Sequence, residues 1–288
     1  MSVALRLSKG APSPIPERRT RVSPVTQIDA SGVPVRIYRP DRPRGDALLW
    51  LHGGGFSGGD LRMPEADWVA TTLAARGHLV VTADYRLATD TVRFPAPSDD
   101  VLIAWAWLRR NAAELGAPRS AHLGGASAGG NLALGAALRL RDGDPVAGAT
   151  RPPDTIVLAY PTLHAVQPAP SAALAALLEQ LPAGQRSEPD YVTAMYTRFI
   201  REPLDRAPAA AIPGVVAPDG LPPVMIVASE IDGLRPSAQA YAELLSAHGI
   251  EHEYIVEPGV RHGHLNQPDE PAALTTLDRF SRWLDAHS

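Results

Sequence analysis

The 288-residue chain contains no cysteine, so disulfide bonds and thiolate metal sites are excluded. It also lacks any apolar run long enough to cross a bilayer. The first ten residues have no continuous apolar core of the kind that a signal peptide requires. These absences predict a cytoplasmic protein that has no membrane partner.

Neither sign of charge is in strong excess. The formal net charge of −4 gives no reason to expect nucleic acid or an anionic membrane as a partner. An apolar share of 45% and a charged share of 20% are typical of a folded globular chain. The length suits one large α/β domain, which we expect to span residues 1–288.

The most informative stretch runs from Gly124 to Asn131 and has one serine, Ser127, at its centre. It follows a short apolar run and precedes a good helix-forming segment, which predicts a strand, a very tight turn and a helix. Gly125 and Gly129 complete a G-x-S-x-G pattern, the nucleophile elbow of serine hydrolases. Glycines there remove the collision that side chains would cause at a strained turn. A Gly/Ser turn without chemistry is the alternative.

A second glycine-rich stretch, His52 to Phe56, directly follows a continuous apolar run. Three consecutive glycines leave the main-chain N–H groups bare, and an acyl-transfer enzyme needs such donors for its oxyanion hole. We expect the donors to be Gly54, Gly55 and Ala128, the last being the residue after the serine. A phosphate-binding loop is the alternative, but that motif carries a lysine that is missing here.

Short apolar segments alternate with amphipathic helical patterns along most of the chain. This alternation predicts an α/β fold with a mostly parallel, doubly wound sheet. Strands are expected at 22–28, 33–38, 47–51, 78–82, 121–123, 155–159, 224–228 and 253–256. Helices are expected at 68–76, 95–115, 132–138 and 236–248 and at the C-terminal end.

Residues 162–214 break this alternation, because they contain prolines and two apolar helical stripes but no strand pattern. We interpret them as a helical cap inserted above the sheet, to which residues 1–21 contribute if they are ordered. Two ordinary surface helices are the alternative. The stripes consist of Leu174, Leu177, Leu178 and Leu181, and of Val192, Met195, Tyr196 and Phe199.

A serine hydroxyl needs a neighbouring base to become a nucleophile. After Ser127, the chain places Asp232 behind the next-to-last expected strand and His262 behind the last one. Ser, Asp, His is the order of the triad in hydrolases that carry this elbow, and strand carboxyl ends are where open α/β sheets place their sites. The alternatives are Glu230 and Glu257 for the acid and His264 for the base.

Taken together, the motifs resemble those of the bacterial hormone-sensitive-lipase family of α/β-hydrolase carboxylesterases. The resemblance runs from about Trp50 to the C-terminus. The motifs that carry it are residues 52–56, 83–88, 125–133, 221–223 and 258–263. It implies an α/β-hydrolase fold and ester hydrolysis without cofactor or metal, with Asp232 and His262 as acid and base. It also implies that His52 mainly holds the loop containing Gly53 in shape, and that homodimers form through an edge strand.

Two positions depart from the family pattern. Gly233 stands where a proline usually follows the acid, and His264 stands where a phenylalanine usually follows the His-Gly pair. Because of this exchange, we expect His264 to face the substrate pocket. The other residues expected to line the pocket are Phe56, Met195, Tyr196 and Phe199.

These features predict a serine carboxylesterase that acts on esters with small to medium acyl groups through an acyl-enzyme. The triad does not distinguish this from hydrolysis of an activated amide, such as a formamide, or of a lactone, because all three pass through a similar tetrahedral intermediate. A ligand-binding receptor on a hydrolase scaffold is the alternative from another class. Such a receptor typically lacks the nucleophile or the base, and both are present here.

Overall fold

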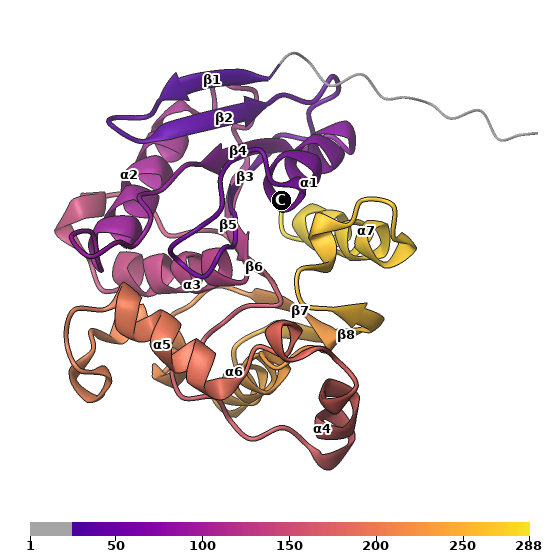
Figure 1. The fold of residues 1–288 in the computed structure, drawn as a ribbon. Helices are drawn as coiled ribbons and strands as arrows, with labels where there is room; N and C mark the ends of the chain where they lie inside the picture. Colours follow the sequence, from indigo (N-terminus) through magenta and orange to yellow (C-terminus); the bar gives the residue numbers. More distant parts are fainter. Residues whose placement is uncertain (1–24) are drawn as a thin grey trace, which may run out of the picture.

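A computed structural model describes residues 25–288, so the predicted contribution of residues 1–21 to the cap lies outside the described residues. Eight strands form one sheet in the order β1-β2-β4-β3-β5-β6-β7-β8 (Figure 1). All pairs from β4 to β8 are parallel, whereas β1 and β2 pair antiparallel with each other, and so do β2 and β4. This confirms the mostly parallel α/β sheet. The strands are β1 (Thr26–Asp29), β2 (Pro34–Tyr38), β3 (Asp46–Leu51), β4 (Leu79–Ala83), β5 (Ser120–Ala126), β6 (Ile156–Ala159), β7 (Val224–Ile231) and β8 (His252–Arg261).

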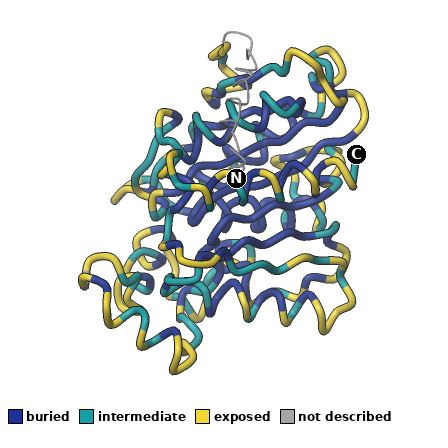
Figure 2. Tube along the Cα trace, turned by 90° about the vertical axis from the view of Figure 1, so that its right-hand side faces the viewer, coloured by how far each residue is buried: buried dark blue, intermediate teal, exposed yellow. Residues whose placement is uncertain are grey.

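Helices cover both faces of the sheet, as the doubly wound prediction requires. One face carries α1 (Pro64–Ala75) and α7 (Pro271–Ala286). The other face carries α2 (Ala96–Asn111), α3 (Ala128–Arg141) and α6 (Arg235–Ala247). Figure 2 shows the central strands as the most deeply buried layer.

Strand β3 illustrates why these segments are continuous apolar runs. All six of its residues are buried. Because side chains alternate along a strand, Leu49 packs in the core beneath α2 and α3, while Trp50 packs in the core beneath α1 and α7. A strand covered on both faces therefore has no solvent-facing position to fill with a polar residue.

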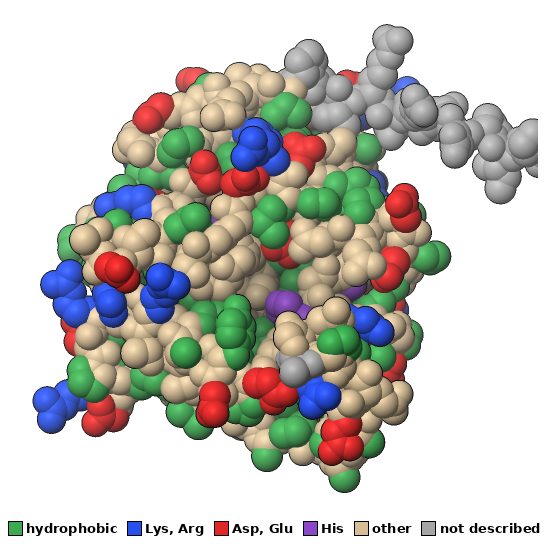
Figure 3. Space-filling model, in the orientation of Figure 1, with side chains coloured by type: hydrophobic (Ala, Val, Ile, Leu, Met, Phe, Trp, Pro, Cys, Tyr) green, Lys and Arg blue, Asp and Glu red, His purple; other side chains and the backbone are tan. Residues whose placement is uncertain are grey.

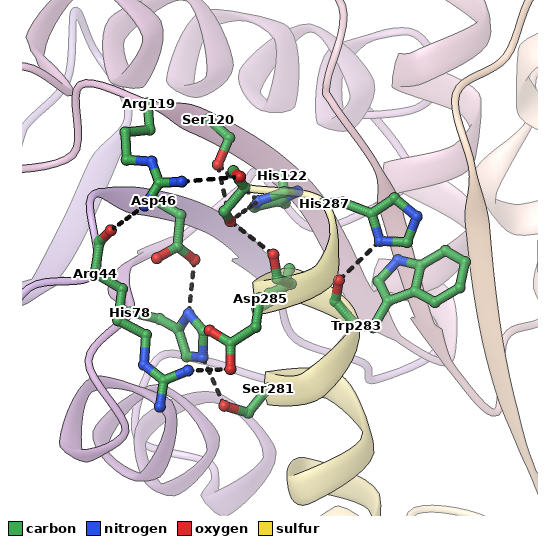
Figure 4. A network of polar contacts seen from close by, with 12 residues as sticks. Arg44, Asp46, His78, Arg119, Ser120, His122, Ser281, Trp283, Asp285 and His287 are labelled. Atoms are coloured by element: carbon green, nitrogen blue, oxygen red, sulfur yellow. Dashed lines mark hydrogen bonds and ion pairs between the residues drawn. The ribbon is translucent and has the colours of Figure 1, made fainter.

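A buried polar network fastens α7 to the amino ends of the strands (Figure 4). The His78 ring lies between Asp46, at 2.6 Å from Nδ1 to Oδ2, and Ser281 of α7, at 2.7 Å from Nε2 to Oγ. All three side chains are buried. The partners satisfy both ring nitrogens, so this histidine is buried without losing its hydrogen bonds.

The segment between β6 and β7 holds two helices, α4 (Ala172–Glu179) and α5 (Pro189–Phe199), and several short 3₁₀ turns. We refer to residues 162–214 as the cap segment. Helix α5 is fastened to the body, because Phe199 stacks on Phe56 with ring centroids 4.0 Å apart. Helix α4 lies further out and buries only Leu174.

Within residues 25–288, none of the helices has the length and apolar character needed to cross a bilayer.

Candidate active site

Ser127 lies at the turn between β5 and α3 and has the backbone angles φ 52° and ψ −116°. This is a strained conformation for a residue that has a side chain, and it projects the hydroxyl from the end of the sheet. The flanking glycines are required by space. A Cβ on Gly125 would lie 2.5 Å from the carbonyl carbon of Gly129, and one on Gly129 would lie 2.3 Å from the oxygen of Leu51.

The structure brings Ser127, His262 and Asp232 together, each from the position directly after a strand. His262 Nε2 lies 3.0 Å from Ser127 Oγ, and His262 Nδ1 lies 2.7 Å from Asp232 Oδ2. The second carboxylate oxygen accepts the N–H of Leu234 at 2.9 Å, which fixes the plane of the carboxylate. When Nδ1 donates to Asp232, Nε2 is free to accept the serine proton, as a general base must.

Electrostatics tune His262 as a base. Burial disfavours the charged imidazolium, but the charge and hydrogen bond of Asp232, together with the charge of Glu65, outweigh burial and raise the pKa of His262. Asp232 is almost fully buried, whereas about a quarter of the His262 side chain, 28%, remains exposed. The imidazole is therefore open to the cavity, while the carboxylate is shielded from water, which strengthens their interaction.

The glycine loop borders the cavity that contains Ser127, and its N–H groups are not used within the described chain. Gly54 and Gly55 both have positive φ, at 116° and 60°, and both line the cavity that contains Ser127. Ala128 is the first residue of α3, so its N–H has no partner within the helix. Among residues 25–288 no acceptor binds the N–H of any of these three residues. They are suited to receive a negative oxygen.

A cavity of about 730 Å³ lies in front of the triad. The body contributes Gly54, Gly55, Ser127 and His262 to its lining. The cap segment contributes the facing wall, from Gly184, Gln185, Ser187, Glu188, Tyr191, Val192 and Met195. Figure 3 shows histidine side chains at the bottom of a hollow in this face.

A model of the α/β-hydrolase fold family matches residues 48–266. Carboxylesterase NlhH of Mycobacterium tuberculosis is 35% identical, over 91% of this chain and 80% of that protein. Ethyl acetate hydrolase of Pseudomonas putida is 36% identical, over 83% of this chain and 73% of that protein. A hyperthermophilic esterase from the archaeon Pyrobaculum calidifontis superposes with a TM-score of 0.76 at 29% identity, covering 92% of this chain and 85% of that one.

The chain belongs to the hormone-sensitive-lipase type of α/β-hydrolase carboxylesterases. The family resemblance drawn from the motifs is thereby confirmed.

In this esterase, His52 does not line the cavity. Its Nδ1–H donates to the carbonyl oxygen of Gly53 at 2.7 Å, and its ring stacks on Tyr85 at 4.4 Å between centroids. The Tyr85 hydroxyl in turn donates to the His52 carbonyl oxygen at 2.7 Å. Burial lowers the pKa of His52, which favours the neutral ring. These contacts agree with a structural role for His52 in shaping the glycine loop.

Of the residues expected to line the pocket, Met195 does so, and Phe56, Tyr196 and Phe199 do not. The expectation for these three is corrected, because all of them are fully buried between α5 and the body. Tyr196 also uses its hydroxyl there, accepting from Asn131 Nδ2 at 2.9 Å. The apolar face of α5 is broad, and most of it packs against the body rather than the cavity.

The expectation that His264 faces the pocket is also wrong. Its Nδ1 lies 2.9 Å from Ser229 Oγ and its Nε2 lies 2.9 Å from Thr276 Oγ1, so the ring bridges β7 and α7. Burial, with a smaller effect of nearby His262, lowers the pKa of His264 to about 4. His264 is therefore a neutral, buried connector.

Three residues near the triad were missed by sequence reasoning: Glu65, Tyr160 and Asn266. Glu65 lies in the first turn of α1, where an acidic residue is ordinary because it complements the helix dipole. Tyr160 and Asn266 follow β6 and β8 without a motif of their own. Their proximity arises only from the fold, so no local signal identifies them.

No group of three histidine or acidic side chains in the described chain is arranged to hold a metal ion.

Proposed function

We propose that this esterase hydrolyses carboxylic esters with small to medium acyl groups, with Ser127 as nucleophile, His262 as base and Asp232 as the acid that orients it. The observation that carries the proposal is the unbroken hydrogen-bond chain from Ser127 Oγ through the imidazole to Asp232, in a cavity open to small molecules. Free N–H groups at Gly54 and Gly55 line the same cavity.

In the first half-reaction, Ser127 Oγ bonds to the ester carbonyl carbon while its proton moves to His262 Nε2. The carbonyl oxygen becomes negative and receives hydrogen bonds from the N–H groups of the glycine loop and of Ala128. Asp232 keeps the Nδ1 proton in place and stabilises the imidazolium. The tetrahedral intermediate then collapses, the bond to the alcohol oxygen breaks, and that oxygen takes the proton from Nε2.

The second half-reaction repeats these steps with water. His262 Nε2 takes a proton from water, whose oxygen bonds to the acyl carbon. The bond between that carbon and Ser127 Oγ breaks, and the proton returns to the serine. The carboxylic acid leaves and the triad is restored.

The size of the substrate is inferred from the cavity and supported by the relatives. A cavity of about 730 Å³ is in the range of small-molecule sites. Met195, Val192 and Leu234 give it apolar wall area, while Gln185 and Gln267 give polar wall area. Ethyl acetate, the substrate in the name of one relative, is a small ester.

Hydrolysis of p-nitrophenyl esters from acetate to laurate tests this proposal. Wild type should turn over the short and medium chains, and Ser127→Ala should lose about 10⁴-fold or more of kcat. Ser281→Ala is the matched control, because Ser281 also contacts a histidine but lies outside the cavity. Equal activity in Ser127→Ala and wild type would refute the proposal. Labelling of Ser127 by a fluorophosphonate without ester turnover would favour an amide or lactone substrate.

A further inference from the structure

Glu65 has an unusual position for a carboxylate. Glu65 is only 2% exposed, yet it contributes to the lining of the active-site cavity. Both of its oxygens accept hydrogen bonds, Oε1 from the N–H of Gly53 at 2.7 Å and Oε2 from the hydroxyl of Tyr160 at 2.8 Å. A buried carboxylate without a cationic partner is costly, and such a group is retained only where its contacts compensate.

The carboxylate also lies close to the nucleophile. A Cβ added to Gly53 would be 2.6 Å from Glu65 Oε1 and 3.1 Å from Ser127 Cβ. Glu65 Oε1 and Ser127 Cβ therefore both lie next to the position that a side chain of Gly53, the first glycine of the oxyanion loop, would occupy. Glu65 and Ser127 can approach Gly53 this closely only because Gly53 has no side chain.

The main chain of Glu65 is held as firmly as its side chain. Its N–H donates to Asn266 Oδ1 at 3.2 Å, and its carbonyl oxygen accepts from Trp50 Nε1 at 2.7 Å. Asn266 belongs to the turn that follows the histidine loop, and Trp50 belongs to β3, the strand that leads into the oxyanion loop. One residue thus contacts both loops of the active site.

Tyr160 extends this connection to the catalytic base. Its ring lies edge-on to the ring of His262, with centroids 5.1 Å apart, and similarly to His264 at 5.0 Å. The Tyr160 ring restricts the ring of His262 from one side, while Asp232 holds its Nδ1. Glu65 holds the hydroxyl end of Tyr160.

We propose that Glu65 is a positioning residue that ties the oxyanion loop at Gly53 to the ring of His262 through Tyr160. Its effect on catalysis rests on the proposed function of the triad. By accepting the N–H of Gly53, the carboxylate directs the following glycines toward the oxyanion. By accepting a hydrogen bond from the hydroxyl of Tyr160, it holds the Tyr160 ring in place, and that ring in turn limits the movement of the His262 imidazole.

The charge of Glu65 adds a second effect. The groups that face His262 are Asp232 from the end of β7, Glu65 from α1, Tyr160 from the end of β6 and the neutral His264. Of these, the two carboxylates favour the imidazolium and raise the pKa of His262. The same charges stabilise the imidazolium that forms while serine attacks.

Two substitutions separate position from charge. Glu65→Gln keeps the length of the side chain, so its oxygen accepts from Gly53 and its amide N–H₂ donates to the Tyr160 oxygen, but the charge is lost. Glu65→Asp keeps the charge but is one methylene shorter, so it loses the reach to one of the two partners. Glu257→Gln is the control, because Glu257 is another buried glutamate, bound to Arg279 instead.

For each variant, kcat and KM are measured across pH, and the pKa of His262 is measured by NMR titration of its ring. We expect Glu65→Asp to lose about 10- to 100-fold of kcat with KM nearly unchanged, because donors are displaced from the oxyanion. We expect Glu65→Gln to retain most of kcat at alkaline pH, and both its NMR pKa and the acid limb of kcat/KM to move to lower pH. Glu257→Gln should resemble wild type in all three readouts.

A folded Glu65→Asp enzyme with unchanged kcat would overturn the positioning role, even if both variants lower the melting temperature. An unchanged pKa of His262 in Glu65→Gln would overturn the effect of the charge. If wild type neither hydrolyses esters nor reacts with a fluorophosphonate, the proposed function fails. The NMR titration needs no turnover, so it still decides whether Glu65 acts on His262.

Discussion

At the residue scale, three side chains in the right order do not make an active site. Asp46, His78 and Ser281 are joined by hydrogen bonds of 2.6 and 2.7 Å (Figure 4). As in the group of Asp232, His262 and Ser127, the carboxylate contacts Nδ1 of the histidine and the hydroxyl contacts Nε2. Asp46, His78 and Ser281 lie at the amino ends of the strands, none is more than 5% exposed, and none lines the active-site cavity. What distinguishes Ser127 is its strained turn, the cavity in front of it and the free N–H groups beside it.

This contrast predicts that Ser281→Ala destabilises the enzyme and leaves its activity unchanged. Removing the hydroxyl leaves one nitrogen of the buried His78 ring without its partner, which costs about 1–3 kcal/mol of unfolding free energy. Urea unfolding and ester turnover of the same preparation provide the measurement. A loss of kcat without a loss of stability would mean that the buried network takes part in catalysis.

A second residue-scale prediction concerns pH. His262 accepts a proton only when neutral, and its pKa is raised above the ordinary 6.5, so kcat/KM should fall as the pH drops through a midpoint above 6.5. Asp232→Asn removes the main group that raises this pKa, so the midpoint should move down while kcat falls by orders of magnitude. A pH–rate profile of each enzyme checks this, and a wild-type midpoint below 6.5 would contradict it.

At the element scale, the sequence pattern located nearly every helix and strand but misjudged several ends. Strand β8 was expected at 253–256 and runs from His252 to Arg261, because its later residues pair with β7 around an irregularity although they lack an alternating apolar pattern. Helix α1 begins at Pro64 rather than at Trp68, since proline at the first helical position was overlooked as a start signal. Pairing across the sheet decides such ends, and a single segment does not contain that information.

The residues of the candidate site likewise fall into those that local sequence predicts and those that only the fold brings together. The elbow, the glycine loop and the histidine loop are contiguous motifs, so their residues could be proposed from the sequence, and the structure places them around one cavity. The lining of the pocket was not, because helical spacing places Met195 and Tyr196 on one apolar face without saying which meets the cavity. Glu65 was missed because its contacts to Gly53 and Tyr160 join distant parts of the chain.

The structure explains why Gly233 replaces the usual proline, and this gives an element-scale prediction. A Cβ here would lie 2.2 Å from the carbonyl oxygen of Arg186 and 2.8 Å from that of Ser187, so the cap segment packs directly on the turn that holds Asp232. Gly233→Ala should push the cap turn outward, lower the melting temperature by several degrees and raise KM for longer acyl chains more than for acetate.

Gly184→Ala is the stability control, because a methyl group added there meets no atom within 4 Å. Equal melting temperatures for Gly233→Ala, Gly184→Ala and wild type would contradict the close packing of the cap on Gly233.

At the scale of the whole molecule, buried histidines should make stability depend on pH. Burial lowers the pKa of both His122 and His264 to about 4, from an ordinary 6.5. Between pH 6.5 and about 4, these two histidines therefore bind protons in the unfolded chain but not in the folded one. Their contribution to stability is complete above about pH 6.5 and is lost as the pH falls to about 4, on the order of 3 kcal/mol for each residue.

Denaturant unfolding at several pH values tests this. The unfolding free energy of wild type should fall from pH 6.5 to 4, and the double variant His122→Gln, His264→Gln should show a smaller slope over that interval. His252→Gln serves as the control, because it removes a histidine other than His122 and His264. An identical slope in the double variant and wild type would show that other groups cause the pH dependence.

The central claim is that Ser127 carries the acyl group during turnover. The most direct test is to quench the esterase with acid while it hydrolyses p-nitrophenyl acetate, and to locate the acetyl group by peptide mass spectrometry. We predict acetylation of the peptide that contains Ser127, and none in Ser127→Ala. Full turnover with no acetyl group on that peptide, or with the acetyl group on another residue, would contradict the account.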